Sequence, residues 1–177
     1  MRWMLCALMC VGMIWAQGKR AEPYRINSDV MGESVEEYWH NNPKCTFLDE
    51  EVRPSELWPG RSEQYLMCYG DDEQLPDGHF DTAYGDVPMR TMSARFVSRE
   101  GLVELSLRFS TSEYARVREQ VIRDFGRPKE GGSAKNDEFW SNGVSRIELN
   151  QEGGDLVIWK ESYFRKAIVT LSKKARQ

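Results

Sequence analysis

The strongest constraint on the fold is a two-residue alternation of apolar and polar side chains in the middle of the chain. Between residues 102 and 109, apolar side chains stand at every second position, with polar or charged ones between them. The apolar set is Val103, Leu105, Leu107 and Phe109. This period predicts a strand with one buried face. Residues 91–97 alternate in a similar way, and the turn residues 98–101 predict that the two segments form a hairpin.

A second group of strands is predicted near the C-terminus, over residues 137–141, 144–150 and 155–160. Asn142 and Gly143 separate the first two, and both residue types tolerate the positive φ of a two-residue type I′ hairpin turn. Shorter or interrupted strands are predicted at 46–48, 62–69 and 84–90. Strands joined by such short turns predict an antiparallel sheet.

Helices are predicted to cover this sheet. Capping boxes at residues 34–37 and 110–113 each begin a helix, and Gly126 ends the second one. Residues 163–175 place their apolar side chains on one helical face, although 168–170 could also extend as a strand. The predicted class is α+β: an antiparallel sheet made of two helix-plus-meander units and packed by two or three helices.

The N-terminus predicts export. Residues 1–18 read as a signal peptide, in which one positive charge precedes an apolar run of 14 residues. A stable membrane span needs about 20 apolar residues, so no stable span is expected. The small residues predict cleavage after Gly18 or, alternatively, after Ala16. Residues 19–33 are then predicted to be a flexible polar arm, and 34–177 a single α+β domain that is secreted or periplasmic.

Cysteine usage supports the same compartment. Two of the four cysteines lie in the predicted signal peptide, which leaves Cys45 and Cys68. An oxidising compartment favours a disulfide between them, worth about 3 kcal/mol for a ring of ~24 residues. The alternative is a metal or redox pair. Their spacing fits no C-x-x-C unit, and His40 and His79 do not complete a tetrahedral ligand set, so no metal site is expected.

The charge distribution argues against nucleic acid as a partner. The chain carries 28 acidic and 24 basic side chains, a net charge of −4. Binding to nucleic acid requires a basic face, and Lys and Arg cluster only in the short tail around Lys173. No cofactor is predicted, and no catalytic residue, because no nucleophile stands in a recognisable motif with a base.

Two acidic segments leave alternatives open. Asp49–Glu51 or His79 could serve a small secreted hydrolase, although an acidic run on a loop is usually a solvated face. The loop Asp71–Asp81 is rich in carboxylates, as calcium sites are. It places Leu75 where the regular calcium-loop pattern requires a ligand, so a solvated turn is the expected structure and an irregular calcium site is the alternative.

The candidate binding residues lie between the two cysteines. Trp58 stands between prolines, with Arg53 and Arg61 close by in the sequence. An exposed tryptophan on a constrained loop would suit a recognition anchor for a protein partner, because it offers a large contact area at little entropic cost. The other interpretation is that Trp58 packs over the disulfide as a cap on the core. An exposed indole is expected for the anchor and a buried one for the cap.

The order of these elements resembles known exported proteins. Gly32–Glu37 with Pro43, and Ser110–Pro128, mark two helices that each stop near a proline and continue into a meander. This order is similar to the tandem α/β units of secreted beta-lactamase-inhibitor proteins and to small envelope proteins of the BamE type. It departs from the BamE type in lacking a lipid-anchor cysteine motif. The resemblance implies a non-catalytic, protein-binding module, either inhibitor-like or envelope-scaffolding.

Overall fold

The computed structural model describes residues 21–43, 45–47, 52–69, 83–129 and 137–175. The helices are α1 (Val35–Asn41), α2 (Tyr114–Phe125) and α3 (Glu161–Lys174), with a 3₁₀ turn at Thr111–Glu113. The main sheet contains β3 (Thr46–Phe47), β4 (Arg53–Pro54), β5 (Ser62–Tyr69), β8 (Thr91–Val97), β9 (Gly101–Arg108), β10 (Asp137–Ser141), β11 (Ser145–Asn150) and β12 (Asp155–Lys160). Two small hairpins are formed by β1 (Arg25–Ile26) with β2 (Asp29–Val30) and by β6 (Ala83–Tyr84) with β7 (Val87–Pro88).

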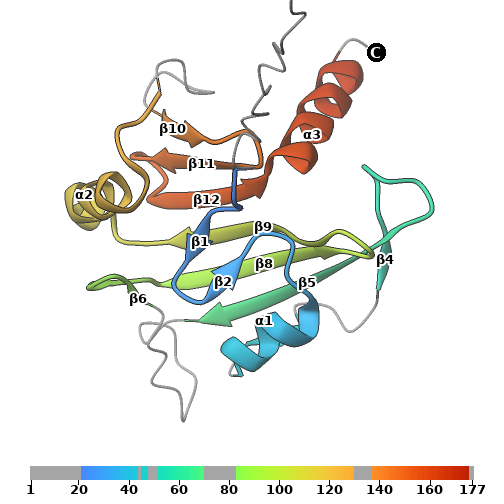
Figure 1. The fold of residues 1–177 in the computed structure, drawn as a ribbon, viewed down its shortest axis with the longest axis horizontal. Helices are drawn as coiled ribbons and strands as arrows, with labels where there is room; N and C mark the ends of the chain where they lie inside the picture. The colour runs from blue at the N-terminus through green and yellow to red at the C-terminus, as the bar shows by residue number, and fades with distance from the viewer. Residues whose placement is uncertain (1–20, 44, 48–51, 70–82, 130–136, 176–177) are drawn as a thin grey trace, which may run out of the picture.

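The predicted α+β class and the antiparallel sheet are confirmed. Seven strands lie in the order β10-β11-β12-β9-β8-β5-β3, and β4 pairs with the start of β5. All of these neighbouring strands run antiparallel. The non-local pairing of β9 with β12 joins the two halves of the chain into one sheet, which Figure 1 shows at its centre.

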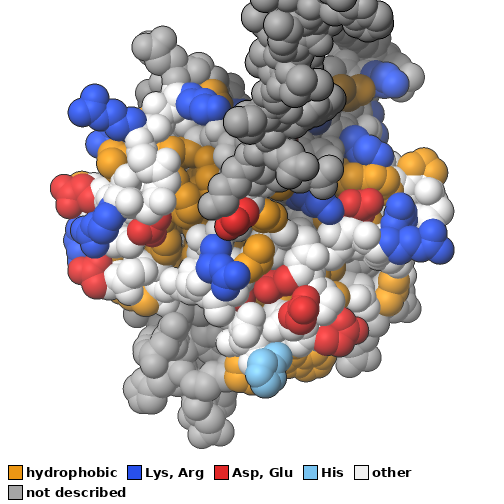
Figure 2. Space-filling model, in the orientation of Figure 1, with side chains coloured by type: hydrophobic (Ala, Val, Ile, Leu, Met, Phe, Trp, Pro, Cys, Tyr) orange, Lys and Arg blue, Asp and Glu red, His pale blue; other side chains and the backbone are white. Residues whose placement is uncertain are grey.

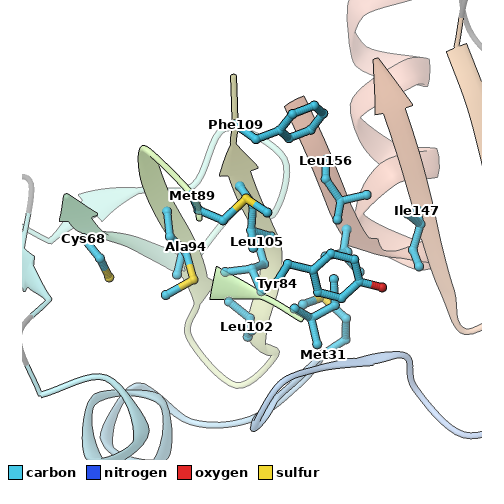
Figure 3. Packing of buried hydrophobic residues seen from close by; sticks show 14 of the residues in the cluster. Met31, Cys68, Tyr84, Met89, Ala94, Leu102, Leu105, Phe109, Ile147 and Leu156 are labelled. Carbon is cyan, nitrogen blue, oxygen red and sulfur yellow. The ribbon is translucent and has the colours of Figure 1, made fainter. Parts of the chain in front are cut away.

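One face of this sheet carries the main core. Side chains from α1, α2 and both small hairpins pack there against the alternating apolar residues of the strands. In Figure 3, Leu105 of β9 and Leu156 of β12 lie in this layer together with Tyr84 of β6 and Met31. All four are at most 5% exposed. The two-residue alternation gives the expected apolar face over Leu105, Leu107 and Phe109. Val103 departs from it, because a β-bulge opposite Arg95 and Phe96 places Val103 in the second cluster and Leu102 in the main core.

The segment expected to be a flexible arm packs onto the sheet in its described part. Ile26 and Met31 are 3% and 5% exposed. The backbone of the segment is also paired: the Gly32 N–H donates to the Leu102 carbonyl, and the Leu102 N–H donates to the Glu33 carbonyl. In the described structure, residues 25–33 are thus held by buried side chains and by backbone hydrogen bonds.

The two predicted capping boxes have different outcomes. At α1, Ser34 Oγ accepts the Glu37 N–H at 3.1 Å and the Glu37 carboxylate accepts the Ser34 N–H at 2.9 Å, so this capping box is confirmed. The prediction of a second box at 110–113 is wrong. The Ser110 hydroxyl makes no cap bond and pairs with Ser112 instead, and the chain enters α2 through a 3₁₀ turn.

Two details near the C-terminus also differ from expectation. The turn before β11 has Gly143 and Val144 at its centre, because the Asn142 N–H donates to the Ser145 carbonyl and Gly143 has φ +86°. A positive φ at the first central residue is typical of type II′ rather than type I′.

Residues 161–174 form the predicted helix α3, but its apolar face is not fully buried. Figure 1 shows α3 running away from the end of β12.

The predicted disulfide is confirmed. Cys45 and Cys68 are bonded, with their Cα atoms 4.4 Å apart, and both are at most 2% exposed. They lie under α1, whose Tyr38 hydroxyl is 3.8 Å from Cys68 Sγ. The bond therefore ties the segment before β3 to β5 inside the main core.

Candidate functional site

The second face of the sheet carries a row of directly opposed side chains. Tyr65 on β5 faces Arg95 on β8, Arg95 faces Glu104 on β9, and Glu104 faces Trp159 on β12. Arg146 on β11 then faces Trp159. Side chains paired across antiparallel strands are in contact distance, so the register alone builds a strip of aromatic and charged groups across five strands.

Arg95 is held at the centre of this strip. Its guanidinium lies 4.7 Å from the Tyr65 ring centroid and 5.6 Å from that of Tyr163. It pairs with Glu104 at 3.3 Å and donates a hydrogen bond to the Tyr163 hydroxyl. Cation–π and ionic contacts on several sides leave the guanidinium little freedom, so the strip is preorganised.

Helix α3 forms one wall of a groove above this strip. Its first turns are anchored by Tyr163, which is 2% exposed and stacks on Trp58 at 5.3 Å, and by Phe164, which lies 5.1 Å from the Trp159 ring. Arg146 packs against the same Phe164 ring at 4.3 Å. Beyond these turns, Ile168 and Leu171 line the groove and are 45% and 66% exposed.

The opposite wall is formed by β4 and the residues that follow it. Pro54 and Leu57 contribute apolar surface, and Glu56 bonds Lys174 at the far end of α3, with 2.9 Å between Oε2 and Nζ. The groove encloses about 760 Å³. Its lining comprises Arg53, Pro54, Glu56, Leu57, Glu63, Tyr65, Arg95, Glu104, Glu148, Trp159, Tyr163, Phe164, Ala167, Ile168, Thr170, Leu171 and Lys174. A mostly apolar pocket with a few polar groups is the usual form of a binding site.

Burial changes the acid–base behaviour of the groove floor. It raises the pKa of the Glu104 carboxyl, and the nearby Arg95 and Trp159 lower it only in part. Burial also raises the pKa of the Tyr65 and Tyr163 hydroxyls, so both stay protonated as hydrogen-bond donors. The Arg95 pKa is raised as well, because Glu104 and Tyr163 outweigh the cost of its burial. The floor therefore presents a guanidinium that stays charged, phenol hydroxyls that stay protonated, and a carboxyl group whose pKa burial raises.

The predicted binding residues are not gathered at one site. Trp58 is 9% exposed and stacked on Tyr163, so it does not project as an anchor. It does not cap the disulfide either, because it belongs to a separate cluster on the groove side of the sheet. Arg53 lines the groove, whereas Arg61 lies outside it, donating to the Ser98 carbonyl and pairing with Glu100 at 3.7 Å.

The remaining chemical candidates are not brought into the groove. Asp49–Glu51, His79 and all of the loop 71–81 lie outside the described residues. His40 is exposed on α1. Within the described ranges, no three His, Cys, Asp or Glu side chains are grouped so that they could hold a metal ion.

Sequence reasoning missed the groove floor, although a signal for it was present. Tyr65, Arg95, Glu104 and Trp159 occupy the positions that alternate with the apolar core residues of their strands. Two of the four, Tyr65 and Trp159, are large aromatic side chains on the face that the alternation leaves outside the core, and these indicate a use for that face. The sequence does not show which strands are neighbours in the sheet. The four side chains form one strip only because their strands are neighbours.

Figure 2 shows one side of the molecule, where acidic and basic side chains are interspersed among hydrophobic ones. Basic side chains do not gather into one patch on the described part of that side. No described helix has the length and apolar character needed to cross a membrane. Comparison of the chain with protein-family models, with curated proteins and with solved structures gave no match. The resemblance to inhibitor and envelope proteins therefore rests on the order of the predicted elements.

Proposed function

We propose that this protein is an exported, non-catalytic module that binds a protein partner in the groove between α3 and the sheet. The observation that supports this most directly is the apolar side of α3, where Ile168 and Leu171 stand exposed over a fixed floor of Tyr65, Arg95 and Trp159. Tyrosine, tryptophan and arginine are the residues that dominate binding energy at protein interfaces. Because the floor is already ordered, little entropy is lost when a partner binds.

The weak packing of α3 supports the same proposal. The helix has 14 residues, and its buried residues are Glu161 and Tyr163 in the first turn. A helix of this length is marginal in water unless its apolar side is packed. A partner that covers Ile168 and Leu171 would supply that packing, and burial of about 100 Å² of apolar surface contributes roughly 2.5 kcal/mol.

Export and the two-unit arrangement are part of the proposal. The apolar segment 3–16 and the disulfide are typical of a secreted or periplasmic protein. The chain order α1, then β3 to β9, followed by α2, then β10 to β12, is compatible with two helix-plus-meander units that share one sheet. An inhibitor or an envelope scaffold would use such a module without any catalytic group.

The proposal is tested by capture with matched variants. The exported protein, its Leu171→Glu variant and its Ala115→Glu variant are immobilised and exposed to the secreted or envelope fraction of the source cells. Ala115 is exposed on α2, which packs on the opposite face of the sheet. A partner bound in the groove is expected to be retained by the wild type and the α2 variant, and reduced at least tenfold by Leu171→Glu. Equal recovery on all three surfaces contradicts the proposal.

A small hydrolase is the second candidate, and one observation favours it. The groove contains the carboxylates Glu63 and Glu104, and burial raises the pKa of Glu104, as a general acid requires. Its test is a panel of ester, peptide and glycoside substrates. Turnover that Glu104→Gln abolishes would favour the hydrolase, and absence of turnover together with groove-dependent capture favours the binding module.

A further inference from the structure

The charges on the groove floor are unequally compensated. Two of its carboxylates have cationic partners, because Glu104 pairs with Arg95 at 3.3 Å and Glu148 pairs with Arg146 at 2.6 Å. Glu63 differs from both. Its hydrogen-bond donors within the described chain are hydroxyl groups, which hold a carboxylate in place without neutralising it.

Glu63 is also fixed and nearly enclosed. It is 7% exposed, and its two oxygens accept from Ser55 Oγ at 2.5 Å and from the Tyr65 hydroxyl at 2.9 Å. The Trp58 N–H donates to the same Ser55 oxygen at 3.0 Å, which directs the serine hydroxyl toward Glu63. Arg53 stands opposite Glu63 in the register of β4 and β5, whereas both direct hydrogen-bond donors to the carboxylate are neutral. A buried carboxylate held by neutral donors is costly, and a further cation brought by a partner offsets that cost.

Away from Glu63, the groove walls offer apolar side chains, which would contact apolar groups of a partner. Along α3, Phe164, Ile168 and Leu171 stand one helical turn apart, and Leu57 faces them from the other wall. The eleven helical residues from Phe164 to Lys174 are separated by ten rises and extend about 15 Å. That length corresponds to four or five residues of extended chain at roughly 3.3 Å per residue.

We propose that the groove binds a polypeptide segment in which aliphatic side chains flank a lysine or arginine. The aliphatic groups pack against Ile168 and Leu171, and the cation pairs with Glu63. This inference rests on the proposed function and names the chemistry of the partner segment. It disfavours an acidic segment, because such a segment would bring a second negative charge beside Glu63.

The test uses three amidated and acetylated pentapeptides of the form alanine-leucine-X-leucine-alanine, in which X is lysine, glutamine or glutamate. Binding to the exported wild-type protein is followed by two-dimensional NMR, through the backbone amides of β5, β8 and α3. The lysine peptide is expected to bind at least tenfold more tightly than the glutamine peptide, equivalent to about 1.4 kcal/mol. The glutamate peptide should bind more weakly than both.

Two variants locate the preference. Glu63→Gln removes the charge and keeps one oxygen that accepts from either Ser55 or Tyr65, while its amide NH2 can donate to the other hydroxyl oxygen. The lysine preference should therefore fall below threefold. Glu119→Gln removes the same charge from the exposed side of α2, on the opposite face of the sheet, and should leave the preference unchanged. The wild-type peptide series remains decisive if Glu63→Gln fails to fold. Equal loss in both variants would indicate a general charge effect and overturn the assignment to Glu63.

Other occupants give distinct results. A second copy of the chain would appear as a concentration-dependent dimer in sedimentation, abolished by Leu171→Glu. A lipid would appear as binding of a fatty acid to the groove amides in competition with the peptides. Either result overturns the proposal, as does equal binding of all three peptides. Groove-dependent capture of a protein without a lysine preference would leave the proposed function standing and this inference wrong.

Discussion

At the level of single residues, Arg95 links three strands and a helix. Its side chain contacts Tyr65, Glu104 and Tyr163, and its side chain and that of Glu104 are 29% and 22% exposed. A partly buried carboxylate that loses its cation is left with an uncompensated charge. Removing one partner is therefore expected to cost more free energy than the intact ion pair contributes to stability.

Replacing Arg95 with methionine should accordingly destabilise the protein by about 2 kcal/mol, below the 3–5 kcal/mol of a fully buried pair because of the partial exposure. Removing both charges, as Arg95→Met with Glu104→Met, should recover at least half of that loss. Urea unfolding of the two single variants and the double variant forms the cycle that measures this coupling. Strictly additive losses would show that the two side chains do not stabilise each other.

Two carboxyl groups beside α1 make stability depend on pH. Burial raises the pKa of Asp29 from 3.8 to about 6, and burial together with the nearby Asp29 raises the pKa of Glu33 from 4.5 to about 7. The folded protein thus holds these protons more tightly than the unfolded chain. The stability that they contribute is fully present below about pH 4 and is lost as the pH rises through 6 and 7.

The free energy of unfolding should therefore fall between pH 5 and pH 8, by about 1–2 kcal/mol from this pair after allowance for solvent screening. Asp29→Asn preserves an oxygen that can accept from the Asn42 side chain and should make the fall smaller. Glu36→Gln, on the exposed side of α1, serves as the control. Chemical unfolding at the two pH values measures the difference, and an unchanged fall in Asp29→Asn would contradict this account.

At the level of elements, the close approach of β9 to the segment after β2 depends on one glycine. Gly101 has φ +72°, and a Cβ there would overlap the carbonyl oxygens of Gly32 and Glu33. Gly143 has a similar φ of +86°, but a Cβ there would have no atom within 4 Å. The two glycines share a backbone conformation and differ in their surroundings.

Alanine substitution should separate the two effects. Gly143→Ala should cost about 1–2 kcal/mol, the penalty of a left-handed backbone alone. Gly101→Ala should cost at least ~2 kcal/mol more, because the segment must move away and expose Ile26 and Met31. Thermal unfolding gives the stabilities, and hydrogen exchange at Gly32 and Leu102 reports whether the segment detaches. Equal losses in the two variants would mean that the segment is not held as described.

The elements that could be predicted are those determined by neighbouring residues. The alternation in 102–109 and the capping box at Ser34 depend on contacts within a few positions, and the structure contains both. The predicted box at Ser110 fails because a capping sequence also fits a 3₁₀ turn. How much of α3 is buried depends on where the sheet ends relative to the helix. Local sequence patterns do not contain that information.

The candidate site was less accessible to sequence reasoning than the fold. The sequence favours Trp58 as a binding residue because it is a large side chain on a constrained loop. Tertiary packing instead stacks it against Tyr163, which is more than 100 positions away in the chain. Glu63 and Glu104 come together only through the register of β5, β8 and β9. Arg53 was identified because it lies near Trp58, and it lines the groove because β4 pairs with β5.

At the level of the whole molecule, the two faces of the sheet differ in what they contribute to stability and to the proposed binding. One side holds the main core, the disulfide and the packed N-terminal segment, so it carries most of the stability. The other side leaves its charged and aromatic row partly open beneath α3. Substitution of the exposed groove residues Ile168 and Leu171, which lie outside the main core, should therefore change binding with small effects on folding.

The route by which the protein reaches its compartment gives the last prediction. Expressed with residues 1–18 in a host that exports it, the chain should lose 18 residues, or 16 if cleavage follows Ala16, and should contain no free thiol. Expressed in a reducing cytosol without residues 1–18, it should keep Cys45 and Cys68 reduced. Its free energy of unfolding should then be about 3 kcal/mol lower, because the ring of ~24 residues is open in the unfolded chain.

Intact-mass analysis with thiol alkylation, followed by urea unfolding before and after oxidation, measures both parts of this prediction. Oxidation of the cytosolic protein should restore the stability of the exported one, since the two cysteines already lie beside each other in the core. A Cys45→Ala, Cys68→Ala variant, which cannot respond to oxidation, is the control. An uncleaved chain with four free thiols in the exporting host would contradict export, and with it the compartment in which the proposed partner is sought.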